Sequence, residues 1–552
     1  AELLNTSVQT SGIVAVREMN ALQVDAQMSI NLVAALAAEG GALSAGAAAV
    51  LASNRLRSQT RAQAVGDTLR SEDGLPLYAI NAAGDLMVSA TDRAGITANA
   101  ALEAQGADGQ VAAGLVAVRN DVRSDVLADS DSMYLMTGGQ LDVAAASEAS
   151  IQADLSGSVG TAEPDPEASS SGGGVSFSGL VATNLMLGDV GAQIIDSAVV
   201  TDGGVSIDAR NKAELSANNS ASASGSGTAI GATLAFNTLG WAAQNTLAAG
   251  ADALLGSGFG TAQPMRTTAH LSRGYVDIGG DLRIEAVQVP QVIASIANAA
   301  SSTGGAGMGV VIASNMIARE VSAFIERQDL SDGEAALINI GGDLVVSASD
   351  TAGIMADISL SASGASAAVG GLFARNDIQG DVWVDVSEVG VQVGGSIELA
   401  ARAAATITAQ LSGDVLTSGS EGGGMAVNAL IATNTIRGDA LVSMARSQID
   451  AGGDVSVSAD QQARIEANNT ANASGEGTAV GVTLAFNLIG REAGNLFTAA
   501  VDAILGGEPG TDGVSLAQVD LNGAQVKAVG DVAVDASGAS VILANITSGA
   551  TA

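Results

Sequence analysis

The stretch GGDLVVSA at residues 341–348 decides the fold, because close copies of it recur along the chain. Other copies are GGDLRIEA at 279–286, GGSIELAA at 394–401 and GGDVSVSA at 452–459. Each copy opens on glycines, continues with apolar residues at alternate positions and closes on an alanine. Glycine supplies the positive φ of tight turns, and alternation with a period of two is typical of a β-strand. The phrase therefore predicts a turn followed by a strand, repeated many times.

The spacing of the copies itself repeats. The closing alanines are separated by 64, 55, 64 and 77 residues in the first half, and by 62, 53, 58 and 77 in the second. The two sets correspond term by term, so the chain contains two cassettes of four units. A fixed period of this kind predicts a solenoid in which each unit contacts its neighbours. The closing alanines are Ala26, Ala90, Ala145, Ala209, Ala286, Ala348, Ala401, Ala459 and Ala536.

These observations predict an all-β fold, an elongated parallel β-helix (β-solenoid) with two short amphipathic helical inserts. We divide the chain into a partial leading coil (1–25), a first four-unit cassette (26–285), a second cassette (286–535) and the start of a further unit (536–552). A typical unit holds about four strand candidates, enough for two β-helix coils of about 20–30 residues. With layers about 4.8 Å apart, roughly 20 coils would form a rod on the order of 100 Å long.

Composition narrows the classes of partner. The net charge is −36, the pI is near 4.1 and the chain has only two lysines, which argues against nucleic acid and anionic membranes as partners. There is no cysteine and therefore no disulfide. Aromatic residues make up 2% of the chain, which suits a narrow, layered core of small side chains. The most apolar stretch, 31–54, contains Glu39 and several glycines, so we do not predict membrane insertion.

Two longer inserts, 240–257 and 490–507, have apolar residues at helical spacing and reach glycine near their ends. An amphipathic helix needs a surface to lie on, either the flank of its own solenoid or another chain. The apolar positions are therefore our candidates for assembly contacts. They are Leu247, Leu254, Leu255, Leu496, Phe497, Val501, Ile504 and Leu505.

A second recurring phrase centres on an asparagine, as in IATNTI around Asn434 and LAFNLI around Asn487. Asparagine favours turns, and stacked asparagine side chains can hydrogen-bond along a solenoid. We therefore expect these residues at turns, in a structural role. They are Asn54, Asn120, Asn184, Asn237, Asn315, Asn376, Asn434 and Asn487.

We predict no catalytic residue and no cofactor. The single histidine, His270, has no cysteine to share a metal with, and we expect it in an exposed loop. Carboxylates recur from unit to unit, which favours turn and surface roles, because a catalytic pair normally occurs once. Any calcium would bind weakly, through several oxygen ligands. Its candidate ligands are Asp121, Asp125, Asp377, Asp381 and Asp385.

Cassettes of the form AGGDVSVSA (451–459) followed by VGVTLAFN (480–487) resemble the repeat regions of giant bacterial surface and secreted adhesins of the filamentous-haemagglutinin-like β-helical type. The resemblance implies an extracellular stalk or filament used in attachment, biofilm or cell-envelope structure. The leading hypothesis is a structural segment, not an enzyme, that self-associates end to end or lies within a longer chain.

Two alternatives stay open. The first is a module that binds a glycan or host-surface protein through loops at 66–79, 160–174 and 326–337. The second is a β-helical polysaccharide lyase or hydrolase, or a phage tailspike. A cluster of acidic, aromatic and basic residues confined to one unit would favour the enzyme, and the sequence shows none.

Overall fold

The all-β prediction is confirmed. Every element of the computed structural model is a β-strand within the residues that it describes, and none of these residues forms a helix able to cross a membrane. The described residues are 2–4, 21–43, 46–67, 75–106, 110–161, 173–243, 260–326, 337–418, 423–490 and 514–552.

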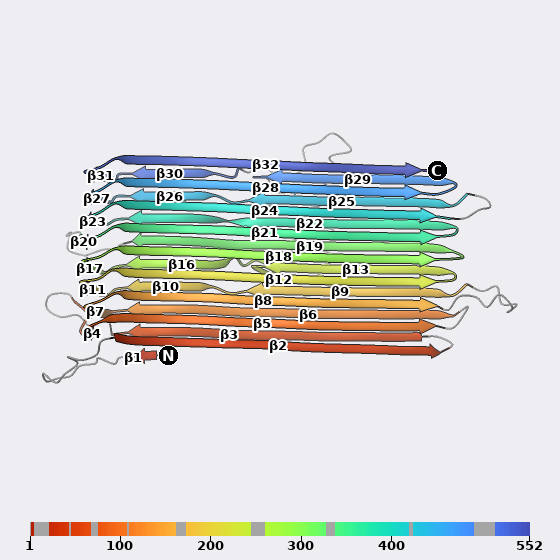
Figure 1. Cartoon of the computed structure of the whole chain (residues 1–552), viewed down its shortest axis with the longest axis horizontal. Coiled ribbons are helices and arrows are strands. Elements are labelled where there is room, and N and C mark those ends of the chain that lie inside the picture. Colours follow the sequence, from red (N-terminus) through yellow and green to blue (C-terminus); the bar gives the residue numbers. More distant parts are fainter. Residues whose placement is uncertain are drawn as a thin grey trace.

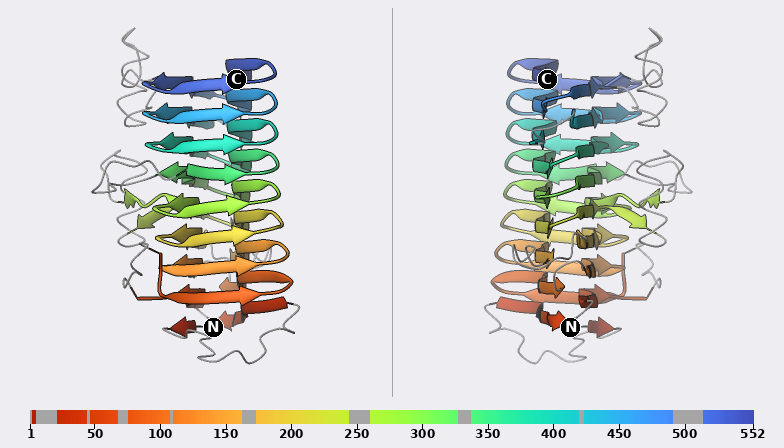
Figure 2. Two further views of the ribbon diagram at one scale, coloured as in Figure 1. Left: turned by 90° about the vertical axis from the view of Figure 1, so that its left-hand side faces the viewer. Right: turned by 90° about the vertical axis from the view of Figure 1, so that its right-hand side faces the viewer.

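The chain winds into a stack of coils that follow one another in sequence order, with the two termini at opposite ends of the stack (Figures 1 and 2). Three large sheets run along the stack, and strand pairing within each is parallel. A coil consists of one long strand in a nine-stranded sheet, one long or two shorter strands in a thirteen-stranded sheet, and a short strand in an eight-stranded sheet. The prediction of a parallel β-solenoid is therefore confirmed.

The nine-stranded sheet consists of β2 (Ala21–Leu43), β5 (Asp85–Gly106), β8 (Leu141–Thr161), β12 (Val205–Gly225), β18 (Leu282–Ser302), β21 (Leu344–Gly364), β24 (Ile397–Thr417), β28 (Val455–Ser474) and β32 (Val532–Thr551). The thirteen-stranded sheet consists of β1 (Glu2–Leu4), β3 (Gly46–Val65), β6 (Val111–Asp131), β9 (Val175–Leu187), β10 (Val190–Ile195), β13 (Thr228–Leu239), β16 (Met265–Ser272), β19 (Ala306–Glu326), β22 (Ala367–Ser387), β25 (Met425–Arg437), β26 (Ala440–Ala445), β29 (Thr478–Ile489) and β30 (Ala517–Asn522). The eight-stranded sheet consists of β4 (Tyr78–Ala82), β7 (Met133–Thr137), β11 (Ala198–Thr201), β17 (Tyr275–Ile278), β20 (Leu337–Ile340), β23 (Gly390–Val393), β27 (Gln448–Ala451) and β31 (Gln525–Ala528).

Each repeat unit forms one coil, so the prediction of two coils per unit is wrong. Ala348 pairs with Ala286 in the coil before it and with Ala401 in the coil after it. The long strands of about 21 residues run through Ala- and Ser-rich stretches that resemble separate short strands in the sequence. Nine strands at about 4.8 Å and 21 residues at about 3.3 Å give a slab roughly 40 Å high and 70 Å wide, instead of a long rod.

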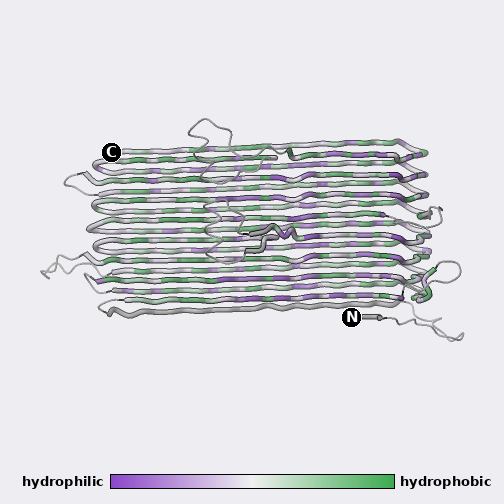
Figure 3. The backbone as a smooth tube through the Cα atoms, turned by 180° about the vertical axis from the view of Figure 1, so that it is seen from behind, coloured by the Kyte–Doolittle hydropathy of each residue, from purple (hydrophilic) through white to green (hydrophobic). Residues whose placement is uncertain are grey.

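The core lies between the two larger sheets, which fill it with alternate residues, and the eight-stranded sheet adds residues such as Leu135 and Val276. In β8, buried and outward positions alternate over its 21 residues. Figure 3 shows hydrophobic and hydrophilic residues interspersed along the coils. The inward side chains are mostly Ala, Val, Leu and Ile, which stack on similar residues in the next coil. Small side chains therefore fill a thin core without large aromatic residues.

The Gly-Gly-Asp phrase makes the turn into β18, β21 and β28. A Cβ atom at Gly341 would collide with the backbone carbonyl of Gly279 in the preceding coil, so glycine is needed there. The aspartate then links coils: the backbone N–H of Asp343 donates to Asp281 Oδ1 at 2.8 Å, and that of Ser396 donates to Asp343 Oδ1 at 2.7 Å. The recurring phrase is thus a coil-to-coil connection as well as a turn.

The predicted helical inserts lie mostly outside the described residues. The eight assembly candidates between Leu247 and Leu505 are all among the residues left undescribed, as are 68–74, 162–172 and 327–336 of the predicted binding loops. The structure corrects the start of the helix predicted over 240–257. Trp241–Ala243 forms strand β14, which pairs antiparallel with β15 (Gly260–Ala262). The first insert therefore begins with a strand pair at its base, and no helix starts at 240.

Candidate functional site

The eight recurring asparagines form one hydrogen-bonded ladder through the core. From Asn54 to Asn487, the Nδ2 of each donates to the Oδ1 of the next at 2.7–2.9 Å. They lie at inward positions within strands of the thirteen-stranded sheet, so their expected placement at turns is wrong. Each of the six asparagines between Asn54 and Asn487 is bonded to the coils on either side, which lets it occupy a buried strand position. The ladder is structural, and its ends lie in β3 and β29.

The five calcium candidates do not come together. Asp377, Asp381 and Asp385 share the outer face of β22, but residues four apart in a strand are about 13 Å apart, far beyond the reach of one ion. Asp121 and Asp377 are buried, not surface residues as expected. No cluster of three or more possible metal ligands occurs in the described part of the chain.

Each of these carboxylates has a protein partner. Asp121 accepts from Arg119 and Arg123, both at 3.3 Å. Asp377 is held between Arg375 at 2.7 Å and Arg437 at 3.1 Å. The remaining three accept hydrogen bonds: Asp125 from the backbone N–H of Asp189, Asp381 from that of Asp439, and Asp385 from the Ser387 hydroxyl.

His270 is a partly buried strand residue, so its expected place in an exposed loop is wrong. It lies in β16, and its ring packs against Phe324 of the next coil with ring centroids 3.9 Å apart. Burial, with a smaller contribution from Arg273, lowers the pKa of His270 to about 4. The imidazole is therefore neutral at pH 7.

The His270–Phe324 pair borders a groove of about 490 Å³ on the outer face of the thirteen-stranded sheet. Its floor is Gly191 in β10, which pairs with Leu127 on one side and Thr268 on the other. Since glycine has no side chain, the surface dips between these two residues. We call this the Gly191 groove. Gln59, Arg61, Asp125, Asp189, Gln193 and Arg266 also line it, and five successive coils contribute.

The charged residues of the Gly191 groove form a chain of contacts from coil to coil. Asp125 accepts from the backbone of Asp189 at 3.2 Å, and Asp189 accepts from the backbone N–H of Arg266 at 2.9 Å. The Arg266 side chain lies 3.3 Å from Glu320. Burial raises the pKa of Asp189, and the hydrogen bond from Arg266 opposes that rise.

The Gly191 groove can bind a polar ligand through several kinds of group. It offers guanidinium, amide, hydroxyl and neutral imidazole groups beside an aromatic ring. Asp125 and Asp189 are already engaged by backbone N–H groups of the following coil, which suits a structural role for these carboxylates better than acid–base chemistry. Sequence reasoning missed this site because its residues come from five coils, and only the register between coils brings them together.

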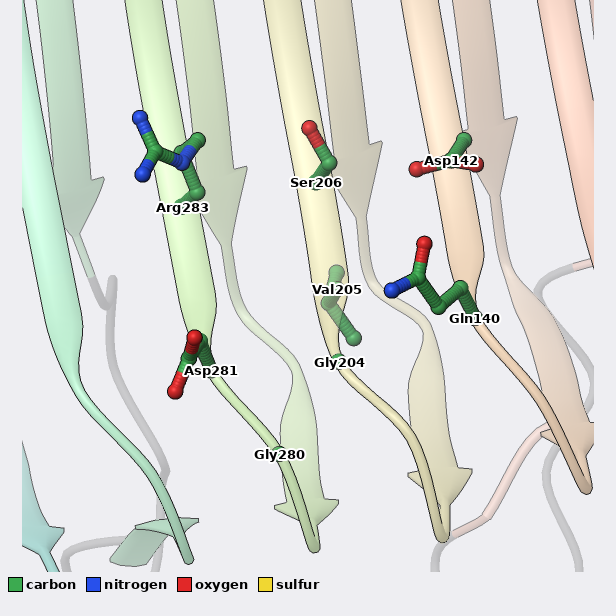
Figure 4. Close-up of a pocket in the computed structure, with 8 residues that line it drawn as sticks. All are labelled: Gln140, Asp142, Gly204, Val205, Ser206, Gly280, Asp281 and Arg283. Atoms are coloured by element: carbon green, nitrogen blue, oxygen red, sulfur yellow. The ribbon is translucent and has the colours of Figure 1, made fainter.

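A second hollow, of about 400 Å³, opens at the turn edge of the nine-stranded sheet (Figure 4). It lies where Gly204 occupies the position that Asp281 and Asp343 fill in the following coils. Gln140 and Asp281 flank Gly204, and Asp142 and Arg283 stand on the strands to either side of Ser206. The gap interrupts the coil-to-coil aspartate contacts and leaves a shallow polar depression.

A scan against protein-family models, a search of curated proteins and a search of solved structures found no match to this chain.

Proposed function

We propose that this chain is a structural β-solenoid segment of an extracellular bacterial fibre or giant adhesin, with no enzymatic activity. The observation that carries the proposal is the continuity of the stack. Parallel strand pairing and the asparagine ladder run from the first coils to the last, so the coils are tied along the axis by main-chain and side-chain hydrogen bonds. Such an arrangement suits a rigid spacer.

The C-terminal coil supports assembly along the axis. Almost all of β32 is exposed, including Val534, Ile542 and Ile546, and within the described residues no strand pairs with its outer edge. An unpaired, apolar edge strand is a template for another strand. We propose that this edge pairs with a strand of a second molecule stacked end to end.

This proposal can be tested on cells that produce the protein. Antibodies raised against the folded chain should label intact cells, and in-frame removal of the segment should reduce attachment to surfaces. Labelling that requires permeabilised cells, or unchanged attachment after the deletion, would contradict the proposal.

A second candidate function, ligand binding, is favoured by the Gly191 groove rather than by the loops. Thr268 lines this groove, so Thr268→Trp should fill it, while Thr406→Trp places the same ring on the exposed face of the nine-stranded sheet. Calorimetric titration with cellohexaose and maltohexaose should show binding that Thr268→Trp abolishes and Thr406→Trp preserves. Absence of binding to the unmodified chain would remove this candidate.

A further inference from the structure

The outer face of the thirteen-stranded sheet carries an apolar surface between its turn edge and the asparagine ladder. Three adjacent columns of outward positions cross eight strands, and none of these 24 residues is charged. We call these residues the apolar face. They are Ala47, Ala113, Phe177, Ile230, Met308, Val369, Val427 and Val480; Ala49, Leu115, Gly179, Ala232, Val310, Gly371, Ala429 and Val482; and Leu51, Ala117, Val181, Leu234, Ile312, Phe373, Ile431 and Leu484.

Many of these side chains are open to solvent. Leu51 is 68% exposed, Phe177 and Val310 are each 40% exposed, and Val482 is 43% exposed. The outward positions of the nine-stranded sheet differ, since they include Arg93, which pairs with Glu148. A chain with a net charge of −36 has thus kept one broad surface free of charge. Surfaces of this kind mark sites of association.

The apolar face has the anatomy and size of a protein interface. Arg–Asp clusters border it on the ladder side, around Asp121 and Asp377, so an apolar centre meets a polar rim. Eight strands at about 4.8 Å and three columns, each two residues or about 6.6 Å wide, cover roughly 760 Å². A standard interface buries about 800 Å² on each partner, whereas the largest apolar patch on a monomer is typically about 300–600 Å².

We propose that the apolar face binds the same face of a second copy of this chain, giving a twofold-symmetric dimer with the two sheets packed face to face. Sheets pack about 10 Å apart when their inner faces interlock, and a second copy offers a surface of equal area and identical strand spacing. In this arrangement the acidic surfaces of both copies stay in solvent. The proposal does not depend on the proposed extracellular role.

The size of the side chains favours a twofold axis that lies between the two sheets and runs parallel to the strands, which sets the first coils of one copy against the last coils of the other. The first coils contribute Ala49 and Ala117, and a hollow of about 510 Å³ lies beside Leu51, Ala117 and Val181. In register with Leu51 and Ala117, the last coils carry Ile431 and Leu484. Small residues at one end would therefore receive large ones from the other.

The test is the mass of the full chain by sedimentation velocity across concentrations. The unmodified chain should sediment as a dimer of twice 53.8 kDa, about 108 kDa. Val310→Asp, at the centre of the face between the small residues Ala232 and Gly371, should raise the dissociation constant about 100-fold by burying an unpaired charge. The matched control is Met355→Asp, which is 56% exposed on the opposite sheet and should leave the dimer intact.

Three results would overturn the proposal. The first is an unmodified chain that stays monomeric at 100 µM. If Val310→Asp then also lowers the melting temperature of the chain, other residues of the same chain cover the face. The second is a dimer that Val310→Asp leaves unchanged. The third is open-ended growth that neither variant alters, which would assign association to the coil ends. Circular dichroism checks that both variants keep their β structure.

Discussion

Arg319 and Asp350 form an ion pair inside the solenoid, with both side chains at most 1% exposed. The Nε of Arg319 in β19 donates to Oδ2 of Asp350 in β21, so the pair joins the two larger sheets across the core. The neighbouring coils do without it: Met265 and Gln288 stand in register with the pair in the coil before, and Gly380 and Ala403 in the coil after. The ion pair is therefore a feature of one coil.

Breaking this pair should cost far more than replacing it. Asp350→Ala leaves the Arg319 charge buried without its partner and should lower the unfolding free energy by about 3–5 kcal/mol. The double variant Arg319→Met with Asp350→Ala removes both charges, takes each new residue from a neighbouring coil and should fall within about 1 kcal/mol of the unmodified chain. Urea unfolding measures both. Equal losses in the single and double variants would show that the charge left behind is not the cause.

The same carboxylate should make stability depend on pH. Burial raises the pKa of Asp350 to about 6, against the opposing effect of Arg319. Because this folded-state pKa is above the unfolded value of 3.8, the contribution of Asp350 to stability is full below about pH 4 and is lost as pH rises through 6. From this group, the unfolding free energy should therefore fall between pH 4.5 and pH 7.

Asp350→Asn removes the titrating group, and its unfolding free energy should vary less with pH over this range than that of the unmodified chain. Urea unfolding at several pH values between 4.5 and 7.5 compares the two curves. Asp357→Asn, on the outward face of the same strand, is the matched control and should follow the unmodified chain. Parallel curves for the unmodified chain and Asp350→Asn would contradict the assignment.

The asparagine ladder should be more sensitive at its centre than at its end. Asn315 is fully buried and bonds to Asn237 and Asn376, so Asn315→Ala leaves two amides short of a partner and should cost about 2–4 kcal/mol. Asn54 bonds only to Asn120 in the ladder and is partly exposed, so Asn54→Ala should cost about 1 kcal/mol. Chemical unfolding measures the difference, and equal costs would count against a continuous ladder.

The turn glycines offer a steric test. Gly341→Ala puts a methyl group into the backbone carbonyl of Gly279 and should destabilise the chain by about 1–3 kcal/mol. At Gly538 an added Cβ meets nothing within 4 Å, so Gly538→Ala should be neutral or slightly stabilising. Thermal unfolding of the two variants should separate them clearly. A neutral Gly341→Ala would mean that the coils are not in the close contact described.

Much of the fold could be predicted from the repeat alone. The closing alanines, from Ala90 to Ala536, are in register across the nine-stranded sheet, and the recurring asparagines do bond to one another. The coil size could not be predicted, because Ala- and Ser-rich strand segments carry weak alternation and resemble breaks. The asparagines were assigned to turns because that preference is strong for isolated residues, whereas a ladder removes the cost of burying the amide.

The candidate sites were harder to predict from the sequence than the fold. Strand β19 carries Asn315, Ile317, Arg319 and Val321 at alternate positions. Once Asn315 is known to face the core, it follows that Arg319 points inward as well. The partner of Arg319, by contrast, depends on how the two large sheets are offset. The Gly191 groove and the apolar face depend in the same way on the pairing of residues 50–80 positions apart.

The ladder, the apolar face and the open edge all depend on one coil per repeat unit, and a distance measurement tests this directly. Ser156 and Ser412 lie in one column of the nine-stranded sheet, four strands apart, and the chain has no cysteine to interfere with labelling. Spin labels on Ser156→Cys and Ser412→Cys should give a backbone separation of about 19 Å by pulsed electron paramagnetic resonance. A separation near 38 Å, as two coils per unit would give, would contradict this account of the fold.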